Sequence, residues 1–159
     1  KVEQIGSKED IFYRPQTQKV AKFFGVKNIF PGKITEIRPE EGEMTAWVEE
    51  KGFQGSIPYR EGAAVGKWVR FCIRPEEIMV LKEDRPIKKN LKANIFAGKI
   101  ARVVEKGADH TLFFKRSQDD YDFEISLSNL AYRSLRIKEG QPVRVAFKWE
   151  SIWLIPEEK

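Results

Sequence analysis

The sequence predicts a mainly β fold in which two tandem small β-barrels follow a pair of short N-terminal helices. Two observations carry this prediction. The chain contains nearly the same phrase twice, NIFPGKI at Asn28–Ile34 and NIFAGKI at Asn94–Ile100. Each phrase opens a series of short segments in which apolar and polar residues alternate, which is the period of a half-buried strand. Two copies are too few for a solenoid, so we interpret them as two related modules.

A second match closes each copy and sets the predicted module boundaries. The stretch GKWVRFCIRPEEIMVL aligns with GQPVRVAFKWESIWLI, so that Arg74 corresponds to Lys148. Between the copies, KEDRPIKKNLKA is charged and contains a proline, which is typical of a linker. We therefore expect a first β module at 28–81, a linker at 82–93 and a second β module at 94–159.

Each copy is expected to contain four or five short strands. A flat sheet of this size would leave open edges, and closure into a small barrel removes them. Gly32 and Gly98, which follow the repeated Asn-Ile-Phe, suit a bend or a close backbone approach at a barrel corner. The strands are predicted in GKITEIRP, EMTAWVEE, GFQGSIP, KWVRFCIRP and EEIMVLKE, and in GKIARVVEKG, HTLFFKRS, YDFEISL, PVRVAFKW and SIWLIPE.

Short helices are predicted outside the strands. Ser7 lies three residues before an aspartate, a spacing typical of a helix N-cap, and Pro15 ends the helical turn that follows. TQKVAKFFG has apolar residues at helical spacing and ends in Gly25. We interpret residues 1–27 as a helical lead-in from a preceding domain. A third helix is expected in SLSNLAYRSLRIKEG, where Gly140 would stop it.

The composition limits the kinds of site that the chain can carry. The net charge of +5 and the pI of about 9.3 suit phosphates, oxyanions or acidic surfaces, and they suit an ordinary background equally well. The single cysteine, Cys72, excludes an internal disulfide framework and a cysteine-rich zinc site, and its apolar surroundings predict a core residue. The single histidine, His110, follows a Gly-containing turn and is expected at the surface.

The stretch from Gln4 to Ile34 resembles the segment that leaves the nucleotide-binding domain of an ABC importer ATPase. That family has a G-x-x-x-E/D-I-Y/F-x-x-P stretch, then V-A-x-F-x-G-x-x-N and the first strand of an accessory domain. IRPEEI, at Ile73–Ile78, is similar to the LRPEDI signature of accessory barrels known as TOBE domains, and the second copy resembles the Mop-like molybdate-binding module. The resemblance implies two tandem small OB-like (TOBE/Mop-like) β-barrels.

The resemblance also implies a function. The chain is expected to be a C-terminal regulatory and dimerisation domain of an ABC importer ATP-binding subunit. Among such importers, its sequence resembles those for molybdate, tungstate or iron most. The implied partners are a second copy bound through the β modules, the missing ATPase domain and the membrane permease subunits. The implied location is cytoplasmic, at the inner face of the inner membrane. In some members this part binds the transported solute or a regulatory protein.

No G-x-x-x-x-G-K-S/T phosphate loop occurs in the chain. We therefore expect no enzymatic activity and no cofactor in this fragment, with ATP and Mg²⁺ confined to the missing nucleotide-binding domain. The paired carboxylates in PEEGE and QDDYD are typical of solvated loops, and no nucleophile and base are recognisable together.

In the Mop-like modules, backbone amides, a serine, an arginine and a lysine hold an oxyanion. A dehydrated dianion needs several fixed donors and compensating positive charge. Here Lys148 matches the lysine of the last hairpin, and Arg144, Ser126 and Ser151 are the further candidate ligands. Glu150 stands where it would repel a dianion. The other interpretation is that Lys148 and Arg144 belong to a solvated strand face.

An OB-type single-stranded nucleic-acid-binding protein is the alternative hypothesis. Small barrels of this kind bind single strands through aromatic and basic side chains. Acidic groups at Glu40–Glu43 and Asp119–Asp122 oppose it, and most of the candidate aromatic residues alternate toward the core. The candidate face would consist of Trp47, Phe53, Trp68, Phe113, Phe114 and Lys115.

Overall fold

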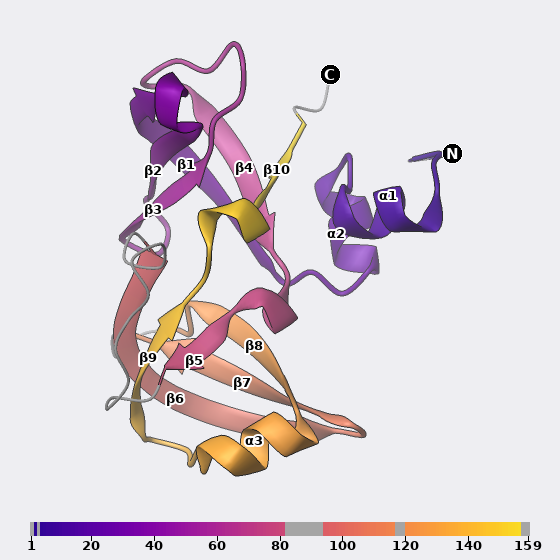
Figure 1. Cartoon of the computed structure of the whole chain (residues 1–159), viewed down its shortest axis with the longest axis vertical. Helices are drawn as coiled ribbons and strands as arrows, with labels where there is room; N and C mark the ends of the chain where they lie inside the picture. Colours follow the sequence, from indigo (N-terminus) through magenta and orange to yellow (C-terminus); the bar gives the residue numbers. More distant parts are fainter. Residues whose placement is uncertain (1, 3, 82–93, 117–119, 157–159) are drawn as a thin grey trace. The chain divides into compact units, whose positions relative to one another are not determined.

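The chain folds into two compact units, each built around a five-stranded antiparallel sheet (Figure 1). The computed structural model describes residues 2, 4–81, 94–116 and 120–156. Unit 1 comprises residues 1–74 and 149–159, and unit 2 comprises residues 75–148. The predicted mainly β fold is therefore confirmed. The predicted linker at 82–93 lies outside the described residues.

The sheet of unit 1 has the strand order β10-β4-β1-β2-β3. Its inward side chains form a tightly buried core that includes Phe30, Ile34, Met44 and Phe71. The 3-10 turns η1 (Pro39–Glu41) and η4 (Trp149–Ser151) precede β2 and β10. The strands are β1 (Asn28–Arg38), β2 (Glu43–Val48), β3 (Phe53–Pro58), β4 (Trp68–Ile73) and β10 (Trp153–Ile155).

The sheet of unit 2 has the strand order β5-β9-β6-β7-β8. Its core is aromatic: the rings of Phe114 and Phe123 are stacked with centroids 6.0 Å apart, and Phe147 meets Phe123 edge-on at 5.5 Å. The 3-10 turn η2 (Pro75–Glu77) precedes β5. The strands are β5 (Met79–Leu81), β6 (Ile95–Lys106), β7 (Asp109–Lys115), β8 (Phe123–Ser128) and β9 (Pro142–Ala146).

The repeated phrase forms equivalent strands in the two units. β1 pairs with β2 and β4, and β6 pairs in the same way with β7 and β9. Both strands carry an irregularity at the same place in the repeat, between Ile34 and Glu36 in β1 and between Ile100 and Arg102 in β6. A bulge at this position bends a strand and lets a small sheet curl. The two-module interpretation is therefore correct for these strands.

The last strand of each copy is exchanged, and here the predicted module boundaries require a correction. β5 belongs to the first copy in sequence but pairs with β9 in unit 2. β10 belongs to the second copy but pairs with β4 in unit 1. The ranges 28–81 and 94–159 therefore describe the sequence repeat and not the folded units. Both strands are apolar triplets, MVL and WLI, so periodicity alone cannot tell which sheet edge accepts which strand.

The N-terminal helices form as predicted. In α1 (Lys8–Tyr13) the Ser7 hydroxyl accepts a hydrogen bond from the Asp10 amide at 3.1 Å, which satisfies a free helix N–H. In α2 (Gln18–Phe23) Thr17 caps the Val20 amide in the same way at 3.1 Å. This second cap was not recognised from the sequence.

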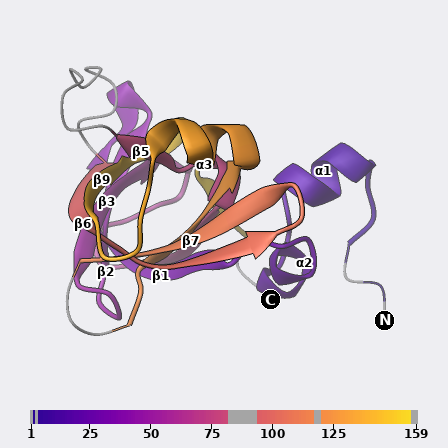
Figure 2. The ribbon, with the colours of Figure 1, turned by 90° about the horizontal axis from the view of Figure 1, so that it is seen from below.

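The third helix is shorter than predicted. α3 (Asn129–Leu135) begins after Ser128, whose hydroxyl accepts from the Ala131 amide, and it lies against β7 and β8 (Figure 2). It ends at Leu135 because Arg136 adopts a left-handed conformation with φ of 51°. Gly140 therefore does not stop the helix; it lies in the turn before β9.

His110 is not the plain surface residue that was expected. It is half-buried, and its ring stacks on Tyr132 of α3 with centroids 3.9 Å apart and an interplanar angle of 11°. The reason is that His110 points to the same side of β7 as the core residues Leu112 and Phe114, where α3 covers it. Cys72, by contrast, is buried as predicted.

The two glycines of the repeat differ in how much space surrounds them. A Cβ added at Gly98 would meet the carbonyl oxygen of Lys115 and would lie 2.7 Å from the Phe114 ring. A Cβ added at Gly32 would lie 3.1 Å from the Ala46 methyl group and from the ring of Phe71. The predicted close approach is therefore present at both positions and is tighter at Gly98.

We expect Gly98→Ala to lower the free energy of unfolding by about 3 kcal/mol, since rigid backbone must move. Gly32→Ala is the matched control and should cost about 1 kcal/mol, because a side chain can yield. Urea unfolding followed by circular dichroism measures both. Equal losses at the two positions would contradict the close approach at Gly98.

Candidate functional site

The four predicted oxyanion ligands are spread over different elements. Arg144 lies on β9, on the face opposite the core residues Val143 and Val145. Lys148 follows the end of β9 and is exposed. These two cations therefore belong to the outer surface of unit 2.

The two serines do not join Arg144 on a neighbouring strand. Ser126 lies on β8 and pairs with Thr111 of β7, so β7 and β6 separate it from β9 in the order of the sheet. Ser151 lies in η4 and belongs to unit 1. The oxyanion site therefore stays a prediction. The register of the sheets does not bring its four candidate ligands onto neighbouring strands.

The predicted nucleic-acid face is also divided by the fold. Phe53 is 3% exposed and Phe114 is fully buried, because both point into the cores. Trp47 and Trp68 are the exposed members, at 40% and 50%. The aromatic residues proposed for stacking on bases therefore do not form one surface.

The densest group of apolar and polar contacts outside the two cores lies where α2 packs on the sheet of unit 1. Ala21 and Val26 pack on Cys72 of β4 and on Ile155 of β10 in one buried cluster. Cys72 is 3% exposed, and burial raises the pKa of its thiol to about 12, although the nearby charge of Arg74 opposes the shift. The thiol is therefore a packing group and not a nucleophile at neutral pH.

Two side chains, Trp153 of β10 and Arg74 directly after β4, hold the N-terminal segment by polar contacts. The indole Nε1 of Trp153 donates a hydrogen bond of 2.7 Å to the carbonyl oxygen of Pro15. The guanidinium of Arg74 lies 3.6 Å from the centroid of the Phe12 ring and donates 3.4 Å bonds to the carbonyl oxygens of Phe12 and Phe24. Sequence reasoning missed both roles, since nothing in the repeat distinguishes Arg74 from its counterpart Lys148.

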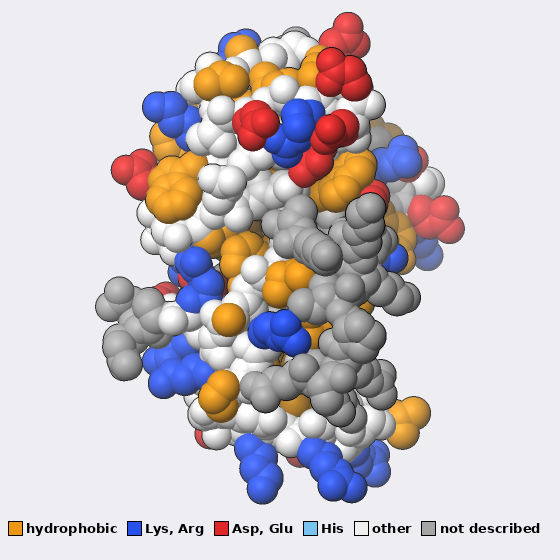
Figure 3. Space-filling model, turned by 60° about the vertical axis from the view of Figure 1, so that its left-hand side comes forward, with side chains coloured by type: hydrophobic (Ala, Val, Ile, Leu, Met, Phe, Trp, Pro, Cys, Tyr) orange, Lys and Arg blue, Asp and Glu red, His pale blue; other side chains and the backbone are white. Residues whose placement is uncertain are grey.

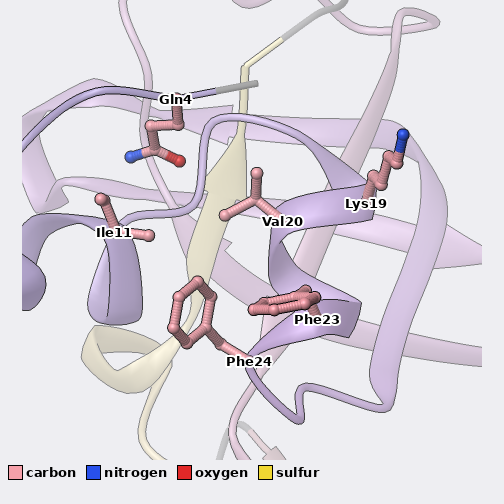
Figure 4. Close-up of a pocket in the computed structure, with 6 residues that line it drawn as sticks. All are labelled: Gln4, Ile11, Lys19, Val20, Phe23 and Phe24. Carbon is pink, nitrogen blue, oxygen red and sulfur yellow. The ribbon is translucent and has the colours of Figure 1, made fainter. Parts of the chain in front are cut away.

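An apolar hollow opens between the two helices (Figure 4). Ile11 and Phe24 line it on one side and Val20 and Phe23 on the other, with Gln4 and Lys19 at its rim. Phe23 is 82% exposed. A second hollow, lined mainly by residues of α1, shares Ile11 and Phe24. The two consecutive phenylalanines of TQKVAKFFG could have indicated this hollow from the sequence, because a six-residue helix is too short to bury both rings.

Other kinds of site find little support in the part of the chain that the structure describes. Its residues contain no group of three histidine, cysteine or acidic side chains that could hold a metal ion. None of its helices is long and apolar enough to cross a membrane.

Two small OB-like barrels in tandem behind a helical lead-in define a TOBE-type accessory region. Comparison with curated proteins confirms the resemblance of the chain to such regions of ABC importer ATP-binding subunits. It is 32% identical over 113 residues to the spermidine/putrescine import ATP-binding protein PotA of Protochlamydia amoebophila, covering 70% of this chain and 29% of the relative. It is 26% identical over 165 residues to PotA of Marinobacter nauticus, covering 99% and 40%.

A third relative is an importer subunit for a different solute. The chain is 27% identical over 153 residues to the molybdate/tungstate import ATP-binding protein WtpC of Pyrococcus horikoshii, covering 96% of this chain and 39% of the relative. The chain thus spans less than half the length of these curated relatives. No family model matches the sequence.

Among solved structures, the chain is similar to the cytoplasmic molybdate-binding protein ModG crystallised with molybdate bound. The TM-score is 0.70 at 15% identity, and the match covers 84% of this chain and 98% of ModG. At this identity the likeness supports the fold, and the OB-like, TOBE-type architecture is confirmed.

Because α2 covers Cys72, the thiol can report whether the helix stays in place. We expect the native protein to react with Ellman's reagent at pH 8 only through opening of the cluster. Trp153→Phe removes one hydrogen bond of about 1 kcal/mol and should speed the reaction about fivefold. Trp68→Phe, at an exposed position, is the control and should leave the rate unchanged. A Trp153→Phe rate equal to that of the wild type would contradict the anchoring role of Trp153.

The raised pKa of Cys72 also sets a pH dependence. Below about pH 9 the thiol is protonated in both folded and unfolded chains. Above that, only the unfolded thiol ionises, so the stability from this group is present below pH 9 and is lost as the pH rises toward 12.

Proposed function

We propose that this chain is the regulatory and dimerisation region of an ABC importer ATP-binding subunit. The observation that carries the proposal is the extent of the sequence similarity. The match to PotA of Marinobacter nauticus covers 99% of the chain, so it runs through the helices and through both barrels. The fold supports the same proposal, because it matches that of the molybdate-binding protein ModG.

The contacts within unit 1 suit the transmission of movement. α2 is packed on β4 and β10, and Arg74 and Trp153 hold the segments on either side of it. A displacement of the helices therefore has to move the sheet, since densely packed elements do not deform continuously. In the whole protein we expect an ATPase domain and membrane permease subunits as partners, at the cytoplasmic face of the membrane, with ATP and Mg²⁺ bound outside this region.

For the solute, we favour an oxyanion such as molybdate or tungstate over a polyamine. The relatives include importers named for both. Arg144, which is half-buried, the exposed Lys148 and the net charge of +5 attract anions and repel polyamine cations. Ser126 and Ser151 are the candidate neutral donors. As the isolated chain lacks a phosphate loop, this role is one of sensing and not of catalysis.

Thermal melting tests the solute. We expect molybdate or tungstate to raise the melting temperature selectively, because a ligand at one hundred times its Kd stabilises the native state by about 2.7 kcal/mol. Sulfate, phosphate and spermidine at equal ionic strength are the comparison ligands. Lys148→Gln should reduce the shift, whereas Lys138→Gln, also an exposed lysine of unit 2, should not. A rise with spermidine alone would refute the oxyanion proposal.

Dimerisation is tested separately by light scattering on a size-exclusion column. We expect the mass to rise from one to two copies as the concentration increases into the high micromolar range. A mass of one copy at every concentration would count against a role in holding two subunits together.

A further inference from the structure

The outer face of the unit 1 sheet is covered at one end and open at the other. The register places Cys72 of β4 beside Ile29 of β1 and Trp153 of β10, and α2 packs on this row. The next row along the strands contains Arg70 and Pro31. The buried cluster that α2 forms with the sheet does not extend beyond the row of Arg70 and Pro31.

The third row is an exposed strip of two tryptophans with a lysine between them. Lys33 of β1 lies directly opposite Trp47 of β2 and directly opposite Trp68 of β4. All three point outward, since their neighbours Ile34 and Val69 point into the core. Opposite residues on antiparallel strands have Cβ atoms about 5 Å apart. We call Trp68, Lys33 and Trp47 the Trp strip.

An acidic cluster follows on the same face. Arg38 of β1 forms ion pairs with Glu36 at 2.7 Å, Glu43 at 3.0 Å and Glu41 at 3.3 Å. It also donates a hydrogen bond of 3.1 Å to the Thr45 hydroxyl of β2. Three carboxylates surround one guanidinium, so this end of the face carries net negative charge, and the end with Lys33 carries positive charge.

Figure 3 brings the side of β2 and β3 forward. Large hydrophobic side chains reach the surface in this view, with acidic and basic side chains close to one another between them. Exposed tryptophans beside charged groups of both signs are typical of contact surfaces, where aromatic residues supply much of the binding energy.

We propose that this face is an interface with a second copy of the chain, related by a two-fold axis. An isologous contact requires a surface that is complementary to itself. With the axis between the two ends of the face, Lys33 of each copy meets the Glu36 and Glu43 carboxylates of the other. The indoles of the two Trp strips then pack beside the axis. The inference rests on the proposed dimerisation role and names its surface.

The charges favour a second copy over a nucleic acid. A single strand lying on Trp47 and Trp68 would bring its phosphates to the carboxylates around Arg38, and this repulsion opposes binding. A protein partner that places carboxylates against Lys33 and a cation against the Arg38 cluster avoids this repulsion. A second copy of the chain, turned by the two-fold axis, presents its charges in this order.

Charge reversal in two single variants tests the interface. In Lys33→Glu and in Glu36→Lys, like charges meet at both symmetric contacts, so each variant alone should dimerise at least tenfold more weakly. In an equimolar mixture the two variants present opposite charges at both contacts, and we expect the dimer to return. Analytical ultracentrifugation in low salt measures all three samples, and thermal melting checks that each variant is folded.

Truncation of the indoles provides an independent measurement. Trp47→Ser and Trp68→Ser should each weaken the dimer at least tenfold, whereas Leu130→Ser, at an exposed apolar position of unit 2, should leave it unchanged. If the tryptophan and charge variants dimerise as strongly as the wild type, this interface is wrong, although dimerisation itself still stands. A monomeric wild type would overturn both. Quenching of tryptophan fluorescence by a short oligothymidylate at micromolar concentration would assign the strip to nucleic acid instead.

Discussion

The pairing of β10 with β4 is the interaction on which unit 1 depends. Three residues, Trp153–Ile155, extend the sheet at its edge, and two of them do more than pair. Trp153 anchors the N-terminal segment through Pro15, and Ile155 completes the buried cluster that holds α2. Without β10 the edge of β4 would be open and the helices would lose their apolar support. A strand that follows unit 2 in the sequence thus holds the helices that precede β1.

The contacts between the helices and the sheet of unit 1 show how the proposed regulatory role would work without chemistry. The helices are fixed to one sheet by a mixed apolar and polar contact, and Arg74 joins both helical segments to the end of β4. A packed contact of this kind transmits displacement because it has few alternative arrangements. The buried, protonated thiol of Cys72 belongs to that packing and takes no part in reactions at neutral pH.

Much of the fold followed from the sequence because its signals are local. Alternation located the strands, Ser7 began a helix, and the repeated phrase marked equivalent strands with the same bulge. The strand exchange did not follow, since MVL and WLI are interchangeable in pattern and only tertiary pairing separates them. The candidate sites were harder still. Alternation does not reveal which side of a strand is covered, so Phe53 and Trp47 were grouped together although they point to opposite faces.

The exchange also imposes an order on folding during synthesis. As the chain leaves the ribosome, β1 to β4 can pair with one another as soon as they emerge. Their sheet stays incomplete while all of unit 2 is made, because the missing edge strand follows unit 2 in the sequence. The first barrel to be translated is therefore the last to be finished.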